Sequence, residues 1–131
     1  MRTLLPLLCS SLALAAPATA SATRHFLTQG PNRVTCDMDA RSVSCLVESP
    51  QVPLLNAMRV TMTPDARLSI CHGIICLSGS TESAPVLVYG RSIAVAPFRC
   101  TATRAGARCV VVKSGRGFQL GAGGVKRIAP G

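Results

Sequence analysis

Short segments in which apolar and polar residues alternate run through the chain from Arg33 to Leu120. Alternation with a period of two is typical of half-buried strands, because successive side chains of a strand point to opposite faces. Turn-forming residues separate the segments, and no segment beyond Ala22 keeps a helical period for three turns. The pattern predicts strands at Arg33–Met38, Ser42–Val47, Met58–Met62, Leu68–Cys71, Ile74–Leu77, Val86–Tyr89, Ser92–Ala96, Phe98–Thr103, Arg108–Val112 and Gly117–Leu120.

Many short strands with evenly spaced turns predict an all-β domain, either a small antiparallel sandwich or a partly open barrel. The segment that ends in Cys36 weakly resembles the one that ends in Cys100, so we expect two related hairpins that pack together. At the ends of the domain we expect less order. The amino terminus should be frayed, and five glycines between Gly115 and Gly124 are too many for a regular strand throughout.

The first residues are typical of a secretory signal peptide. Arg2 precedes a short apolar run, and the segment ends in Ala18-Thr19-Ala20, so we expect residues 1–20 to be removed on export. The alternative is a lipoprotein signal with Cys9 as the lipidated residue, although Leu8 occupies a position that requires a small side chain. No later apolar stretch is long enough to be a transmembrane segment. The sequence therefore predicts one domain, residues 21–131, that is secreted, periplasmic or attached to the cell envelope.

The expected export determines how the cysteines that follow the signal peptide are interpreted. An even number of cysteines in a small exported chain predicts disulfides. We expect three bridges, with the pairs chosen by spacing: Cys36–Cys45, Cys71–Cys76 and Cys100–Cys109. None of these spacings matches a zinc site, a redox Cys-x-x-Cys or a haem attachment, so we expect no metal and no cofactor.

The two longer cysteine pairs bracket turn-like residues. A two-residue turn at Ala40-Arg41 places Cys36 directly opposite Cys45, at a position where antiparallel strands approach most closely. In the second hairpin, a type I turn followed by Gly106 as a bulge residue shifts the register by one. That turn predicts a diagonal arrangement of Cys100 and Cys109.

Four motifs in the carboxyl-terminal third occur in order: Leu87-Val88-Tyr89-Gly90, Pro97-Phe98-Arg99-Cys100, Gly106-Ala107-Arg108-Cys109 and Gly115-Arg116-Gly117-Phe118-Gln119-Leu120. They resemble the signature L-x-Y-G, F-x-C, G-x-x-C, G-H-G-F-x-L of a family of small exported bacterial domains of unknown function, which has actinobacterial and some proteobacterial members. The resemblance extends more loosely to the segment around Cys36. It implies a disulfide-bonded β domain without an assigned activity. Arg116 stands where the family usually has His, so any chemistry that depends on that His would be lost here.

Candidate catalytic residues are few, and we expect the protein not to be an enzyme. Asp37 and Asp39 alternate along a strand and would share a face, but beside a turn they are more simply solvated or turn-stabilising. His25 lies near the amino terminus, and His72 is interpreted as a turn residue. No serine lies in a Gly-x-Ser-x-Gly elbow, and three bridges leave no free cysteine nucleophile.

Positive charge is concentrated in the carboxyl-terminal half. The chain has 14 Lys and Arg against 5 Asp and Glu, a net charge of +9, and no acidic residue follows Tyr89. This half predicts contact with an anionic envelope polymer or a lipid surface. The residues that would carry the contact are Arg91, Arg99, Arg104, Arg108, Lys113 and Arg116. The alternative, that these charges only keep the protein soluble, remains open.

These observations favour a binding or structural module at the cell envelope. Specific nucleic-acid recognition is disfavoured, because alternation places Phe98, Phe118 and Tyr89 in the core rather than on a stacking surface. A secreted inhibitor or toxin-like effector on the same disulfide scaffold is the alternative. A dominant exposed loop would favour the inhibitor, whereas a flat basic face would favour the envelope module.

Overall fold

The computed structural model describes residues 23–30, 33–48, 57–77 and 84–130. The predicted signal peptide and Cys9 lie outside these ranges. The described residues form strands and a single turn of 3-10 helix, with no α-helix. The elements are β1 (Arg24–Thr28), β2 (Arg33–Met38), β3 (Val43–Glu48), β4 (Met58–Met62), β5 (Leu68–His72), η2 (Ile74–Cys76), β6 (Val86–Leu87), β7 (Ser92–Val95), β8 (Phe98–Thr103), β9 (Gly106–Val111), β10 (Gly117–Gly121) and β11 (Gly124–Ile128).

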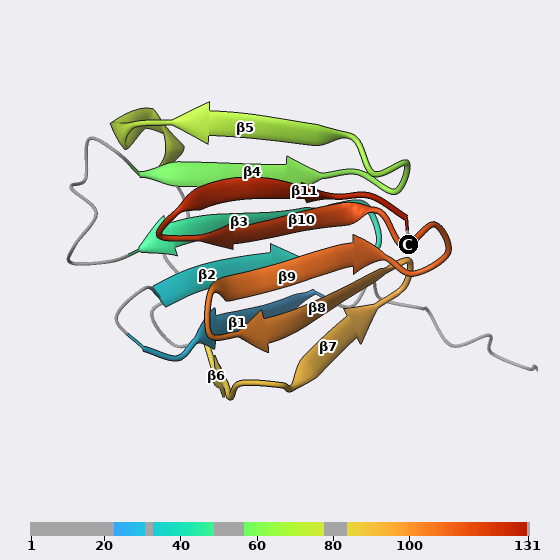
Figure 1. Ribbon diagram of the computed structural model, residues 1–131, viewed down its shortest axis with the longest axis horizontal. Helices are drawn as coiled ribbons and strands as arrows, with labels where there is room; N and C mark the ends of the chain where they lie inside the picture. Colours follow the sequence, from blue (N-terminus) through green and yellow to red (C-terminus); the bar gives the residue numbers. More distant parts are fainter. Residues whose placement is uncertain (1–22, 31–32, 49–56, 78–83, 131) are drawn as a thin grey trace, which may run out of the picture.

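The strands form two sheets that overlie each other in Figure 1. Sheet A has the order β5-β4-β3-β2-β1-β6, and sheet B has the order β11-β10-β9-β8-β7. The first five strands and the last five are thus both antiparallel meanders in chain order, while β6 joins sheet A parallel to β1. The predicted antiparallel sandwich is confirmed. The expected relation between the two hairpins extends to the arrangement of the whole sheets.

The core lies between the two sheets and includes all three phenylalanines of the chain, Phe26, Phe98 and Phe118, each 0% exposed. The alternation predicted from sequence places their side chains on the inner faces. Tyr89, which we expected in the core, is instead 39% exposed. Its motif ends at a turn rather than in a paired strand, so the alternation does not apply there.

Two disulfides meet at the centre of this core. Cys36–Cys45 joins β2 to β3, and Cys100–Cys109 joins β8 to β9, each between the second and third strands of its meander. The Sγ atoms of Cys45 and Cys109 lie 3.9 Å apart, so the two bridges are in contact across the sandwich. The Cα atoms of each pair are 4.1 Å apart, the close approach expected at a non-hydrogen-bonded position.

The second hairpin differs from its predicted register. Thr103 pairs with Gly106 across a two-residue turn, so Cys100 lies directly opposite Cys109 rather than diagonally. Gly106 has a φ of 137° and provides the left-handed backbone within the ladder, without the extra residue of a bulge. Both core disulfides therefore have the same geometry, as the sequence predicted only for the first.

Both ends of the domain are more regular than expected. β1 pairs with β2 rather than fraying, because Phe26 and Thr28 are buried on the inner face of sheet A. At the other end, β10 and β11 form a hairpin. Gly121 pairs with Gly124 next to the turn, so these glycines shape the ends of the strands rather than interrupting them.

The segment after β5 was predicted as a strand and is a 3-10 turn instead. Gly73 reverses the chain with a φ of 93°, and Cys76 is bonded back to Cys71. The two Cα atoms are 5.8 Å apart, whereas an extended segment of this length spans about 17 Å, so the bridge excludes a strand. His72, expected in a turn, is the last residue of β5 and pairs with Met58.

Candidate functional site

The outward face of sheet B carries a row of polar residues across all of its strands. Ser92, Thr101, Arg108, Gln119 and Lys126 lie opposite one another in register from β7 to β11. The hydroxyl oxygens of Ser92 and Thr101 are 2.7 Å apart and hydrogen-bonded. The row thus contains two long cationic side chains, Arg108 and Lys126, which are both exposed on the outward face of the five-stranded sheet.

A third cation joins these two from the neighbouring row. Arg99 pairs with Val110 and is therefore a diagonal neighbour of Arg108, about 7–8 Å away. Lys126 is two strands from Arg108, roughly 10 Å. These separations are close to the Debye length of about 8 Å at physiological salt, so the potentials of the three charges overlap. We call Arg99, Arg108 and Lys126 the basic face.

No ion pair of the described residues involves the basic face. No Asp or Glu follows Tyr89, whereas the ion pairs of His25 with Asp37 and of Arg67 with Asp65 lie in sheet A. Cations that lack a carboxylate partner repel one another and attract mobile anions. The basic face is thus a positively charged surface and not part of a balanced salt-bridge network of the described residues.

Two glycines leave the outward face of β10 without a side chain on either side of Gln119. Gly117 and Gly121 occupy outward positions of β10, where a Cβ would lie 1.9 Å from the carbonyl oxygen of Cys109 and 1.8 Å from that of Ala105, respectively. The backbones of β9 and of the β8–β9 turn therefore exclude any side chain at these positions. As a result, the basic face has no projecting side chain from β10 except Gln119.

The predicted anion-binding residues do not form a single patch. Arg99 and Arg108 lie on the basic face, but the other four lie at opposite ends of sheet B. Arg91 and Arg104 are near the β8–β9 turn, where the Arg104 guanidinium lies 5.7 Å from the centre of the Tyr89 ring. Lys113 and Arg116 belong to the β9–β10 connection.

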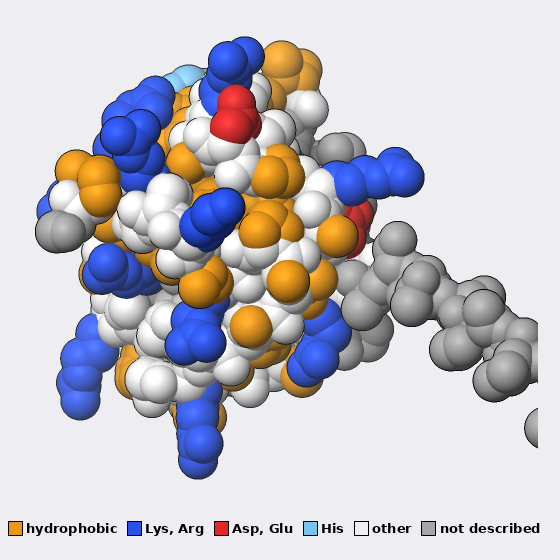
Figure 2. Space-filling model, turned by 90° about the vertical axis from the view of Figure 1, so that its right-hand side faces the viewer, with side chains coloured by type: hydrophobic (Ala, Val, Ile, Leu, Met, Phe, Trp, Pro, Cys, Tyr) orange, Lys and Arg blue, Asp and Glu red, His pale blue; other side chains and the backbone are white. Residues whose placement is uncertain are grey.

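The length of β9 separates these ends by roughly 20 Å, more than two Debye lengths, so the six residues cannot act as one site. Figure 2 looks onto the end that carries the β9–β10 connection and shows Lys and Arg side chains spread out, with apolar and uncharged side chains between them. Sequence reasoning missed Lys126, because it treated the glycine-rich end as irregular. The residues from Gly121 to Ile128 do not alternate regularly between apolar and polar, so no periodic signal in the sequence predicted β11.

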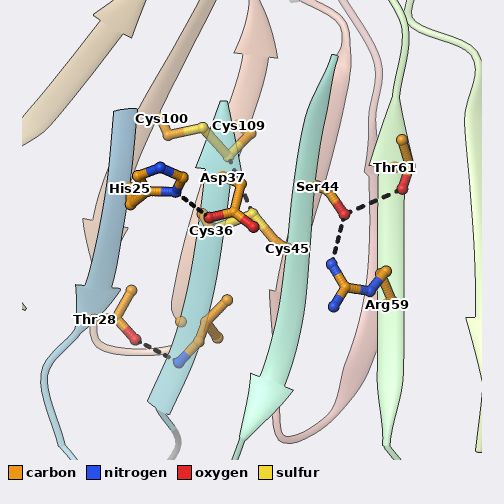
Figure 3. Close-up of a disulfide and its surroundings, with 12 residues drawn as sticks. His25, Thr28, Cys36, Asp37, Ser44, Cys45, Arg59, Thr61, Cys100 and Cys109 are labelled. Atoms are coloured by element: carbon orange, nitrogen blue, oxygen red, sulfur yellow. Dashed lines mark hydrogen bonds and ion pairs between the residues drawn. A yellow bond between two sulfur atoms is a disulfide. The ribbon is translucent and has the colours of Figure 1, made fainter. Parts of the chain in front are cut away.

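A second polar cluster lies on the outward face of sheet A and contains the residues we considered for catalysis. His25 Nδ1 and Asp37 Oδ1 are 2.5 Å apart, and Asp37 pairs with Ser44 in the sheet register (Figure 3). The hydroxyl of Ser44 accepts hydrogen bonds from Arg59 Nη1 at 2.9 Å and from Thr61 Oγ1 at 3.3 Å. Asp37 is thus held by a histidine, which corrects the expectation of a simply solvated or turn residue.

This cluster lacks the order of a catalytic triad. Nucleophilic serine needs a histidine beside it, with the carboxylate on the far side of the histidine. Here Asp37 lies between the other two, so His25 and Ser44 are two strands apart, roughly 10 Å. The three residues therefore do not provide a base for the Ser44 hydroxyl.

Asp39 has the turn role expected from sequence. Its Oδ1 accepts hydrogen bonds from the backbone N–H groups of Arg41 at 2.7 Å and Ser42 at 3.0 Å. The side chain thus closes the turn between β2 and β3 and is not available to pair with Asp37 as a second acid.

The sulfur atoms of Cys36, Cys45 and Cys109 form the tightest group of metal-ligand atoms among the described residues, all within 4.8 Å of one another. Metal ions bind thiolates, and these sulfurs are bonded in the two core disulfides. The cluster is therefore structural in the oxidised protein.

A scan against protein-family models and searches of curated proteins and of solved structures give no match. The resemblance to exported bacterial domains of unknown function thus stays a hypothesis, carried by the motifs quoted above. Within the described ranges, no helix is long and apolar enough to cross a membrane.

Proposed function

We propose that this protein is an exported, non-enzymatic module that binds an anionic polymer or lipid surface of the cell envelope through the basic face of sheet B. The observation that carries the proposal is the grouping of Arg99, Arg108 and Lys126 on one face of sheet B, in a part of the chain, after Tyr89, that has no acidic residue. Export is supported by the signal-like residues 1–20 and by the three disulfides, which persist in oxidising compartments.

The ligand chemistry is a repeated array of phosphate or carboxylate groups. Each cation that contacts such an array releases condensed counterions, and this release drives binding without any readout of sequence or headgroup. A sheet face with cations roughly 7–10 Å apart suits an extended polyanion or a bilayer surface better than a small ligand, which is normally held in a concave pocket. The surrounding Thr101 and Gln119 add neutral hydrogen-bonding groups.

A salt titration with two probes tests the proposal. The full chain, expressed with its own amino-terminal segment and purified in oxidised form, is titrated with a soluble polyphosphate and with vesicles that contain anionic or only zwitterionic lipids. We expect binding to polyphosphate, to anionic vesicles or to both, and its loss as salt rises. Tight binding to anionic vesicles alone identifies a lipid source, and tight binding to polyphosphate alone identifies a polymer. Equal binding to zwitterionic vesicles, or binding that is insensitive to salt, would refute the proposal.

One feature favours the alternative of a secreted inhibitor. The disulfide-closed loop from Cys71 to Cys76 displays Ile74 and Ile75, which are 59% and 85% exposed, and a rigid apolar projection is suited to a partner's pocket. This alternative predicts that Ile75→Asp abolishes binding to the partner protein. Salt should hardly change that binding, and variants of the basic face should leave it intact.

A further inference from the structure

Among the residues that the structure describes, no strand pairs with the outer edge of β5, the outermost strand of sheet A. Two backbone hydrogen bonds flank the β4–β5 ladder: the N–H of Thr63 donates to the carbonyl oxygen of Arg67, and the N–H of Gly73 donates to that of Ala57. Because backbone groups of a strand point alternately to either side, the N–H and C=O groups of Leu68, Ile70 and His72 point away from β4. Figure 1 shows β5 at the border of the sheet.

This edge lacks the features that normally prevent strand pairing. Edge strands are usually protected by charged side chains, proline, bulges or short length. β5 has none of these, whereas β6 has two residues and follows Pro85, and β7 is shorter and follows Arg91. On β11, an antiparallel pairing about the central residue would place Lys126 opposite its own copy, which repels.

Exposed apolar residues are concentrated beside the same edge. Ile70, Ile74, Ile75 and Leu77 are 41%, 59%, 85% and 36% exposed, and together they make up half of the exposed large hydrophobic residues of the described chain. Ile70 lies on the inner face, opposite Val60, yet it is not covered. Ile74, Ile75 and Leu77 follow β5 closely in the chain, and exposed apolar side chains gathered in one region are typical of an interaction site.

We propose that β5 pairs with β5 of a second copy of this chain, antiparallel and centred on Ile70. In this register Ile70 pairs with Ile70 of the second copy, and Leu68 pairs with the second copy's His72. The backbone N–H and C=O groups of Leu68, Ile70 and His72, which point away from β4, then form hydrogen bonds with the second copy, up to about six in total. Two protomers with a formal charge of +9 repel each other, but no Lys, Arg, Asp or Glu lies within this strand. The nearest charges along the chain, Asp65 and Arg67, form an ion pair at 3.7 Å.

Such a dimer has a defined shape. Adjacent antiparallel strands are related by a two-fold axis perpendicular to the sheet, so sheet A continues from one protomer to the other and both copies of sheet B lie on the same side. The two basic faces then point in one direction and can contact one anionic surface together, which raises avidity. This gain in avidity rests on the proposed function, whereas the dimer itself does not.

Sedimentation velocity of the oxidised full chain, without any polyanion, tests the dimer between about 1 μM and about 1 mM, a range suited to a small interface. The variant Ile70→Lys places like charges across the axis, and Val86→Lys is the matched control at the opposite edge of the same sheet. We expect the parent and Val86→Lys to dimerise as concentration rises. Ile70→Lys should dimerise at least tenfold more weakly, with an unchanged circular dichroism spectrum.

Hydrogen exchange provides a readout that needs no variant. The amides of Leu68, Ile70 and His72 should gain protection as the concentration of the parent rises, since they are free only in the monomer. A parent that stays monomeric up to about 1 mM would overturn the dimer. So would a folded Ile70→Lys that dimerises like the parent, a Val86→Lys that loses the dimer equally, or protection of these amides that does not depend on concentration.

Discussion

Short polar side chains close the turns of sheet A. Asp39 accepts two backbone N–H groups between β2 and β3, and the hydroxyl of Thr63 donates to the Asp65 carboxylate between β4 and β5. Buried polar groups are satisfied in a similar way, since the fully buried Thr28 hydroxyl accepts a hydrogen bond of 2.9 Å from the N–H of Val34. At the residue scale, side-chain hydrogen bonds thus hold three connections of sheet A, those between β1 and β2, β2 and β3, and β4 and β5.

The Asp65 carboxyl gives a prediction at this scale. Its pKa lies below the usual value, first because Thr63 donates a hydrogen bond to it and further because of backbone N–H groups and Arg67, while desolvation acts in the opposite direction. Because the folded pKa is lowered, the associated stabilisation is present above the unfolded pKa and is lost as pH falls through the folded value. Thr63→Ala should raise the pKa of Asp65, as measured by NMR titration, whereas Thr63→Ser should not. An unchanged pKa in Thr63→Ala would contradict the assigned cause.

At the scale of elements, the hairpins were predictable because their signals are local. The spacing of Cys36 and Cys45 around Ala40-Arg41 is sufficient to set the register of β2 and β3. β1 and β11 were missed because their pairing depends on strands elsewhere: Phe26 is buried only once β2 lies beside it, and β11 is ordered by β10. The strand expected at Ile74–Leu77 failed for a similar reason, because its bridge to Cys71 overrides β propensity.

The three disulfides should differ in their contribution to stability. Loop closure alone gives roughly 2.7 kcal/mol for each ten-residue loop and about 2.2 kcal/mol for the six-residue loop. Cys100 and Cys109 are 0% exposed and touch the other core bridge, so Cys100→Ala with Cys109→Ala also loses core packing. We expect its loss in denaturant unfolding free energy to exceed that of Cys71→Ala with Cys76→Ala. Equal losses would show that contact between the core bridges adds nothing.

At the scale of the whole molecule, two similar meanders carry different surfaces. Sheet A has the acidic residues Asp37, Asp39, Glu48 and Asp65, while sheet B has none. This asymmetry was visible in the sequence. The sequence did not show which cations share a face, because this depends on the register of four strand pairs. Only Arg99 and Arg108 of the predicted set lie on the basic face. The third member, Lys126, comes from the β10–β11 hairpin, which was not predicted because its sequence is rich in glycine.

The most direct test of the central claim compares two triple variants of equal charge. Arg99→Gln, Arg108→Gln and Lys126→Gln together neutralise the basic face, while Arg24→Gln, Arg33→Gln and Arg41→Gln neutralise three exposed cations of sheet A. Both reduce the formal charge from +9 to 9 − 3 = +6. For polyphosphate or anionic vesicles, the slope of log K against log salt should fall by about 2–3 in the first variant and by less than about 1 in the second. Equal slopes in the two variants, or a basic-face variant that binds like the parent, would contradict the account.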